Sequence, residues 1–238
     1  MDNATYVTLT RQSGLLREMQ LVANNIANAS TTGFRREGLV FAEHVAALGP
    51  DEPSLSMAHA SARAVYLNGG ELTLTGGPLD FAIEGEGFFL IDTAGGQRLS
   101  RAGSFSTSAE GLLVDAMGNR LLDAGGAPVF LPPDASAVTL SPDGTLAADG
   151  VPVAQVGLWQ PLSKTDLVHE AGTLFRADGE LVPVQDSKLR QGFLEGSNVE
   201  PVAELARMVE VQRAYELGQS FLEREDERVR GVISTLGR

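Results

Sequence analysis

Apolar residues recur with helical spacing at both ends of the chain and with strand-like spacing between them. Near the N-terminus, intervals of seven, three, four and three separate Leu9, Leu16, Met19, Ala23 and Ile26. This spacing places the five side chains on one narrow face of a helix, which we expect to run over residues 4–28. The segment 30–33, Ser-Thr-Thr-Gly, favours the end of that helix, with the glycine in a left-handed conformation.

A second and longer helix is predicted at the C-terminal end. Ser197 and Asn198 are expected to cap it, and Pro201 is tolerated in a first turn. At ~1.5 Å per residue, a continuous helix of about 38 residues would be roughly 57 Å long and would need another helix beside it. Its heptad positions are mostly apolar or aromatic: Leu205, Met208, Gln212, Tyr215, Gln219, Leu222, Asp226, Val229, Ile233 and Leu236.

Short alternating runs separated by glycine-rich turns fill the middle of the chain. Strands are expected at 72–75, 88–91, 111–114 and 153–159, and hairpin turns at the Asp-Gly pairs 143–144, 149–150 and 178–179. Residues 42–64, which include two prolines, are expected to be extended. The prediction is an α+β fold in which residues 1–36 and 198–238 form a discontinuous helical domain, 37–65 a connector, and 66–197 an inserted antiparallel all-β domain.

Charge separates the chain into the same parts. The chain has 18 basic and 31 acidic residues, for a net charge of −13. The two terminal segments carry +2 and −2, so the whole net charge belongs to residues 37–197. This acidic balance disfavours binding to nucleic acid. No run approaches the roughly 18 apolar residues of a membrane span, and the start lacks the basic and apolar regions of a cleaved signal, so we expect neither feature.

Residues that carry out chemistry are sparse. The chain has no cysteine, which excludes disulfides, thiolate metal sites and a cysteine nucleophile. His44, His59 and His169 lack metal-ligand spacing. The segment 85–88, Gly-Glu-Gly-Phe, lacks the third glycine and the helix of a dinucleotide site, and we interpret it as a turn between strands. We therefore assign no catalytic, cofactor-binding or metal-binding residue and expect no cofactor, with a carboxylate-pair hydrolase as a disfavoured alternative.

Three ordered blocks carry a resemblance to a known family. They are residues 23–36 (ANNIANASTTGFRR), residues 78–89 (PLDFAIEGEGFF) with 101–105 and 111–114, and residues 191–199 (QGFLEGSNV) with 208–216. Together they resemble the flagellar rod and hook family of axial proteins over nearly the whole chain. The length and both chain ends are most similar to the proximal-rod members, and a distal-rod or hook-type relative is the alternative.

This resemblance implies a structural role and a set of partners. The terminal helices would pair as a coiled coil that lines the tube, and the chain would polymerise helically to transmit torque from motor to hook. Its partners would be copies of the chain, other proximal and distal rod proteins, and the flagellar type III export apparatus. It would be located in the rod of the basal body, which spans the periplasm. The resemblance also implies that the chain is exported without a cleaved signal peptide.

We expect the assembly interface to combine the apolar stripes with polar residues of the first block. Asparagine is a poor helix former, so three asparagines within five residues suggest either polar contacts at an interface or fraying of the helix end. The expected interface residues are Leu9, Leu16, Met19, Ala23, Asn24, Asn25, Ile26, Asn28, Thr31, Gly33, Phe34, Leu205, Met208, Tyr215, Leu222, Val229, Ile233 and Leu236. Other classes stay open: a secreted β-domain enzyme or carbohydrate-binding module, and a flagellar assembly scaffold or hook cap.

Overall fold

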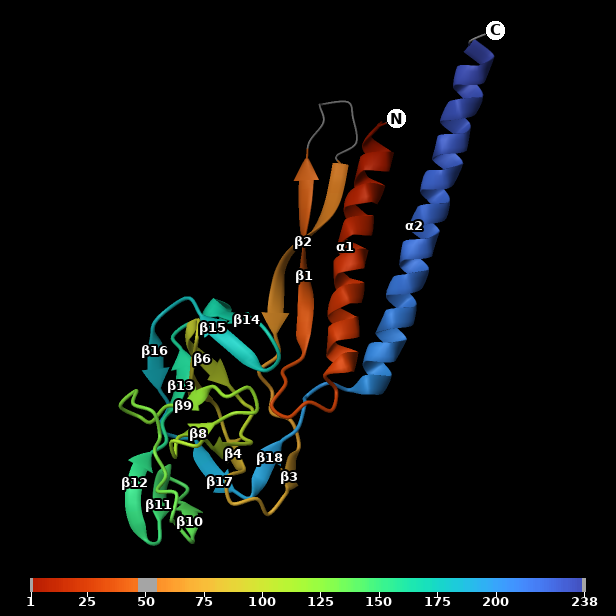
Figure 1. The fold of residues 1–238 in the computed structure, drawn as a ribbon. Helices are drawn as coiled ribbons and strands as arrows, with labels where there is room; N and C mark the ends of the chain where they lie inside the picture. The colour runs from red at the N-terminus through yellow and green to blue at the C-terminus, as the bar shows by residue number, and fades with distance from the viewer. Residues whose placement is uncertain (1, 47–54, 237–238) are drawn as a thin grey trace. The chain divides into compact units, whose positions relative to one another are not determined.

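The computed structural model describes residues 2–46 and 55–236, with side chains described at 7–40, 63–163 and 165–235. Two long helices and eighteen strands form within these residues (Figure 1), and every pair of these strands is antiparallel. The α+β class predicted from the sequence is confirmed. The chain divides into two units: a helical unit, Met1–Ala27, Glu37–Tyr66 and Glu200–Arg238, and a β unit, Asn28–Arg36 and Leu67–Val199.

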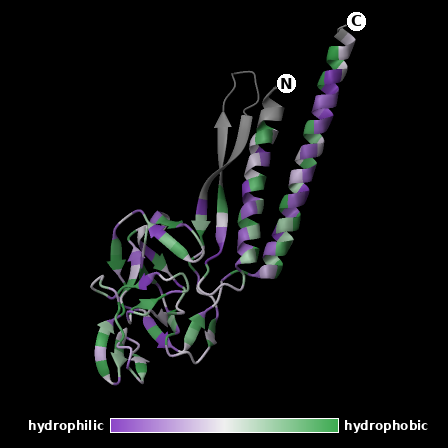
Figure 2. Cartoon of the chain, viewed as in Figure 1, coloured by the Kyte–Doolittle hydropathy of each residue, from purple (hydrophilic) through white to green (hydrophobic). Residues whose placement is uncertain are grey.

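The helical unit contains α1 (Asp2–Ala27), α2 (Pro201–Leu236) and a hairpin of β1 (Glu37–Ala46) and β2 (Leu55–Val65). The two helices run antiparallel beside each other (Figure 1). Apolar residues recur along both helices (Figure 2), yet the only large apolar side chains that are buried among the described residues of this unit are Leu21, Val22 and Val211. Within the described residues, the two helices therefore bury few apolar side chains between them.

Short strands make up the β unit. Three of them form a meander in the order β10-β11-β12, and four others form the two-stranded sheets β17-β4 and β18-β3. The remaining nine form one sheet in the order β14-β15-β6-β5-β9-β8-β7, in which β13 also pairs with β5 and with β16. The bounds are β3 (Leu72–Leu74), β4 (Phe81–Glu84), β5 (Phe88–Thr93), β6 (Gly96–Ser100), β7 (Ser106–Thr107), β8 (Leu113–Val114), β9 (Arg120–Leu121), β10 (Val138–Leu140), β11 (Thr145–Ala148), β12 (Val151–Gln155), β13 (Leu158–Pro161), η1 (Lys164–Asp166), β14 (Leu167–His169), β15 (Leu174–Ala177), β16 (Leu181–Pro183), β17 (Lys188–Gln191) and β18 (Phe193–Glu195).

One contiguous apolar cluster forms the core of the β unit. The rings of Phe89 and Phe105 meet edge to face with their centroids 5.5 Å apart. Buried aliphatic side chains from four strands surround them: Leu113, Leu121, Leu146 and Leu189. Because burial of apolar area is the main favourable term in folding, this unit carries most of the stability of the chain.

The local predictions for the β unit are confirmed in part. Strands form at 72–74, 88–93 and 113–114, and residues 85–87 of the expected turn 85–88 connect β4 to β5, which begins at Phe88. Asp149 and Gly150, with φ of 49° and 81°, turn β11 into β12 as predicted. The run 153–159 is not one strand, because β12 ends at Gln155 and β13 begins at Leu158. The turn at 178–179 forms no hairpin, because β15 pairs with β14 and β6 while β16 pairs with β13.

The boundaries between the parts differ from the expected ones in three ways. Residues 28–36 group with the β unit, and the expected connector forms the β1-β2 hairpin of the helical unit, apart from 47–54, which lie outside the described residues. Helix α1 ends at Ala27, so Gly33, although its φ is +72°, does not terminate it. Ser197 and Asn198 lie too far before Pro201, the first residue of α2, to cap it.

Candidate assembly site: a buried ion cluster and a helix pair

The N-terminal and C-terminal segments of the β unit are joined by hydrogen bonds. The Gly33 N–H donates to the Glu195 carbonyl at 2.7 Å. Three residues further along, the Arg36 N–H donates to Oδ1 of Asn198 at 2.6 Å. Asn198 also donates from its Nδ2 to the Asn68 carbonyl at 2.9 Å. Residues far apart in the sequence are thereby held side by side at the edge of the β unit.

A buried ion cluster, made of Arg35, Arg101 and Glu195, lies beside these contacts. The three side chains are 0%, 4% and 2% exposed. Arg35 Nη2 lies 2.6 Å from Oε1 of Glu195, and Arg101 Nη1 lies 3.1 Å from Oε2. The Gly70 N–H also donates to Oε1 at 2.9 Å. Both oxygens of one carboxylate are therefore used to neutralise guanidinium groups from two distant parts of the chain.

Strand β4 and the turn that follows it supply further acceptors to the cluster. Arg101 donates from Nη2 to the Gly85 carbonyl at 2.6 Å, and from Nη1 to the Ile83 carbonyl at 3.3 Å. Its guanidinium also lies 5.4 Å from the ring centre of Phe88. Burial lowers the pKa of Arg101 to about 10, and the Glu195 carboxylate acts in the opposite direction. Arg101 therefore stays charged at neutral pH, in a place where an unpaired charge would be costly.

Asn25 is the polar centre of the helical unit. Its Nδ2 donates to the Glu37 carbonyl at 2.8 Å and to Oε2 of Glu204 at 3.1 Å. Its Oδ1 accepts from the Glu37 N–H at 3.0 Å, so the amide pairs with the β1 backbone as another strand would. Asn25 is only 1% exposed. One side chain of α1 thus links both the hairpin and the first turn of α2.

Two more polar contacts join the helices towards the N-terminus of α1. Glu18 pairs with Arg207, with 2.5 Å between Oε1 and Nη2, and this hydrogen bond raises the pKa of Arg207. Gln12 donates from Nε2 to the Tyr215 carbonyl at 2.8 Å. Gln12 closes directly over Gly218, where any Cβ would meet its amide nitrogen. The helix contact therefore depends on polar side chains as well as on Leu21, Val22 and Val211.

Replacing Asn25 by aspartate is expected to loosen the helical unit. The change keeps the shape of the side chain but removes both donors and places a carboxylate 3.1 Å from that of Glu204. A buried group left without its partner costs about 1–3 kcal/mol, to which the repulsion between the carboxylates adds. Thermal melting followed by far-UV circular dichroism should show earlier loss of helix. Asn24→Asp, at the neighbouring exposed position, is the control, and an equal loss there would contradict the role of Asn25.

The residues predicted for the interface fall into three groups. Leu9, Leu16, Ala23, Asn24, Leu205, Val229 and Ile233 are exposed, whereas Met19, Ile26, Asn28, Thr31, Met208, Tyr215 and Leu222 are half-buried. Asn25 is buried within the helical unit, and Gly33 and Phe34 are buried within the β unit. The side chain of Leu236 lies outside the described residues. The exposed stripe of α1 and the face that packs on α2 are thus different faces of one helix.

Sequence reasoning missed the charged residues that join the segments. Arg35, Arg101 and Glu195 all fall inside or beside the sequence blocks quoted above, but no spacing pairs residues that are 160 positions apart. Glu18 and Glu204 were equally absent from the expected set. The available signal was the presence of charged residues within otherwise apolar and glycine-rich blocks, which indicates burial with a partner.

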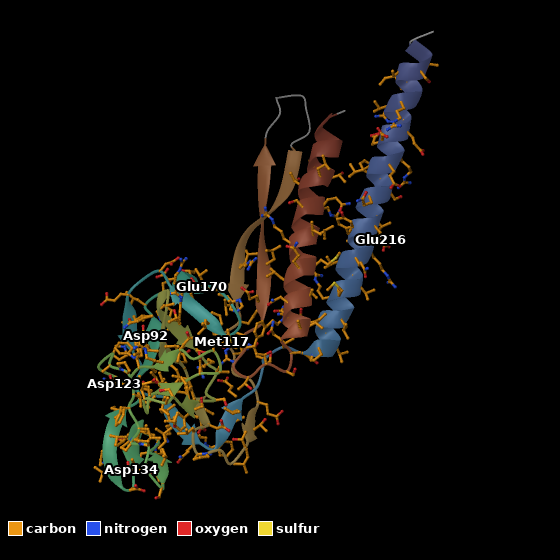
Figure 3. All side chains as sticks on the ribbon, in the orientation of Figure 1. Asp92, Met117, Asp123, Asp134, Glu170 and Glu216 are labelled. Atoms are coloured by element: carbon orange, nitrogen blue, oxygen red, sulfur yellow. The ribbon has the colours of Figure 1, made fainter. Side chains whose placement is uncertain are left out.

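No group of three His, Asp or Glu side chains is placed to hold a metal ion within the part of the chain that the structure describes. Asp92, Asp123, Asp134 and Glu170 lie apart over the β unit (Figure 3). His169 contacts the Gly172 carbonyl at 2.8 Å and packs edge-on against Phe34, while the side chains of His44 and His59 are outside the described residues. Among the described helices, none has the length and apolar character to cross a membrane.

Comparison with known proteins covers both the terminal segments and the β unit. Residues 6–35 match the family described as "Flagella basal body rod protein", residues 82–148 the "Flagellar hook protein FlgE/F/G D1 domain", and residues 190–234 the "Flagellar basal body rod FlgEFG protein C-terminal". The chain is 38% identical to the flagellar basal-body rod protein FlgF of Caulobacter vibrioides, over 100% of this chain and 99% of the relative. The chain belongs to the FlgF family of flagellar basal-body rod proteins.

Other relatives support this placement within the rod proteins. FlgF of Mesorhizobium japonicum is 36% identical over 100% of this chain and 99% of its own length. FlgG of Agrobacterium fabrum is 29% identical over 94% of this chain and 95% of its own length. The three regions that match the rod families each supply one member of the ion cluster: Arg35, Arg101 and Glu195. In this FlgF-family chain the cluster therefore connects the three regions that match the rod and hook families.

Proposed function

We propose that this chain is a structural subunit of the proximal rod, which polymerises helically through its terminal helices and transmits torque from motor to hook. The observation that carries the proposal is the exposed apolar surface of the helices, in a chain that belongs to a rod family. Exposed large apolar residues rimmed by polar ones mark protein interaction sites. On the helices they are Leu9, Leu16, Val202, Leu205, Val209, Leu217, Phe221, Val229, Val232 and Ile233.

Pairing of the helices as a coiled coil is part of this proposal. Among the described side chains of the helical unit, the three buried apolar ones give little burial to offset the ordering of two long helices. The full order of the helices would then come from contacts with neighbouring subunits, in a coiled-coil lining of the rod. Limited proteolysis of the dilute monomer should cut α1 and α2 before the β unit. Helices that resist the protease as long as the β unit does would contradict this.

The proposed partners follow from the same arrangement. Copies of this chain and other proximal and distal rod proteins would contact the exposed helix faces, in the rod where it spans the periplasm. The flagellar type III export apparatus would deliver the chain without a cleaved signal. The role proposed is structural and not catalytic, and it assigns no cofactor to the chain.

Leu16→Glu is expected to abolish swimming while the chain still folds. Leu16 is 46% exposed in the helical unit, so a charge is tolerated there in the monomer but not in a buried contact between subunits. The measurements are swimming in soft agar and peptide mass spectrometry of purified hook–basal bodies, from which the variant should be missing. Leu16→Met keeps the apolar surface and should behave as the parent. Normal swimming with Leu16→Glu, or absence of the parent chain from basal bodies, would contradict the proposal.

A further inference from the structure

The buried ion cluster contains more positive than negative charge. Arg35 and Arg101 share the single carboxylate of Glu195, so the three buried side chains together carry one excess positive charge. Burial is the largest cause of the lowered pKa of Arg101, and the nearby charge of Arg35 lowers that pKa further. A buried charge without a counter-charge is costly, because water no longer solvates it. One more anion beside the cluster would therefore stabilise it.

Some guanidinium nitrogens of the cluster make no hydrogen bond within the part of the chain that the structure describes. They are Nε and Nη1 of Arg35 and Nε of Arg101, and all of them are buried. A guanidinium group donates through each of its nitrogens and accepts nothing. Buried donors are normally satisfied by protein, by ordered water or by an ion. The hydrogen-bonding groups left over in the cluster are thus donors, which is what an anion requires.

A small cavity lies against Arg101. Its volume is about 50 Å³, and Arg101 lines it together with Gly85, whose carbonyl accepts from Nη2, and Phe88, whose ring lies under the guanidinium. Leu67 and Pro161 add apolar atoms to the lining. The space exceeds the roughly 10–15 Å³ that one water molecule needs. It can therefore hold a halide ion, whereas an organic anion of several carbons is too large for it.

Glu86 also lines the cavity, and its charge opposes an anion there. In contrast to the residues of the cluster, Glu86 is exposed. Its carboxylate raises the pKa of Arg101, but less than the carboxylate of Glu195 does. Water and salt screen an exposed charge much more than a buried one. The attraction from the two buried arginines therefore outweighs the repulsion from Glu86.

We propose that the cavity beside Arg101 is a binding site for a small monovalent inorganic anion such as chloride. The ion would accept a hydrogen bond from the Arg101 guanidinium and balance the excess positive charge of the cluster. Binding needs only the folded β unit, so this site goes beyond the proposed function and does not depend on assembly. Because the cluster joins segment 28–36 to β18, the ion would stabilise that junction.

Chloride should therefore stabilise the β unit in a saturable way. The full chain would be unfolded in urea and followed by Trp159 fluorescence, while sodium chloride replaces sodium gluconate stepwise at constant ionic strength. Gluconate is too large for the cavity, so the screening of surface charges stays the same while the concentration of the small anion changes. An ion that binds only the folded chain raises the folding equilibrium constant about elevenfold at ten times its Kd.

Two exposed glutamates distinguish binding in the cavity from a general effect of salt. Glu86 lines the cavity, whereas Glu84 pairs with Arg190 outside that lining. Glu86→Gln and Glu84→Gln remove the same charge from the surface of the β unit. We expect Glu86→Gln to lower the Kd for chloride several-fold and Glu84→Gln to leave it nearly unchanged. Equal Kd values in the two variants, or stabilisation that does not saturate, would overturn the site.

Crystals of the full chain grown in sodium bromide would locate the ion, because bromide scatters X-rays anomalously. The expected result is an anomalous peak beside Arg101 in the parent chain and a stronger one in Glu86→Gln. Peaks at other places alone, which would be an adventitious ion only, or no peak at all, would overturn the proposal and leave water as the occupant of the cavity. None of these outcomes bears on assembly, so the proposed function is tested separately by swimming and by the content of basal bodies.

Discussion

Replacing Glu195 by glutamine is expected to lower the free energy of unfolding of the β unit by about 3–5 kcal/mol. The amide is the size of the carboxylate but carries no charge, so Arg35 and Arg101 would remain buried as two cations without an anion between them. Removing one member of a buried ion cluster costs more than the cluster itself contributes, because the charges left behind stay desolvated. The junction of the N-terminal and C-terminal segments should loosen together with the cluster.

Trp159 offers a selective way to measure this loss. It is the only tryptophan of the chain and lies in β13 of the β unit, so its fluorescence in a urea titration reports on that unit and not on the helices. Glu84→Gln is the matched control, because Glu84 pairs with Arg190 at 3.3 Å on the surface, where an ion pair contributes about 0–1 kcal/mol. Equal stability of the two variants would mean that the buried charges of the cluster are neutralised in another way.

The periodicity of the sequence predicted the helices well because each one repeats a pattern over many turns. Helix α1 was expected over residues 4–28 and spans Asp2–Ala27, and α2 begins at Pro201 as a proline in the first turn requires. The same pattern did not identify the face that packs within the chain. The buried positions of α1 include Gln12, Glu18 and Asn25, and polar residues are expected outside unless a partner satisfies them. The partners on α2 are about 180 to 200 residues away in the sequence, and the partner of Asn25 on β1 belongs to a strand. Helical periodicity identifies neither kind of contact.

The boundaries of the parts were harder to predict for a related reason. Residues 37–65 contain few strong strand formers in alternation, and the hairpin they form depends on pairing between β1 and β2 and on packing against α1. Residues 28–36 have the composition of a helix end, yet Phe34 and Arg35 are fully buried in the β unit. Burial of this segment depends on Arg101 and Glu195, so the contact is decided by tertiary structure and not by local propensity.

Gly33→Ala is expected to destabilise the β unit by roughly 2–5 kcal/mol, combining a strained backbone with a steric collision. Gly33 has a φ of +72°, and a Cβ there would meet the backbone of Arg101 and Ala102, which has no flexible end to move aside. Gly76 also has a φ of +72° but faces open space, so Gly76→Ala carries the backbone strain alone, about 1–2 kcal/mol. The difference between the two variants, again from Trp159 fluorescence in urea, isolates the collision. A Gly33→Ala variant no less stable than Gly76→Ala would show that segment 28–36 does not need its close approach to Arg101. The buried ion cluster would then hold segment 28–36 against β18 without the tight backbone contact beside it.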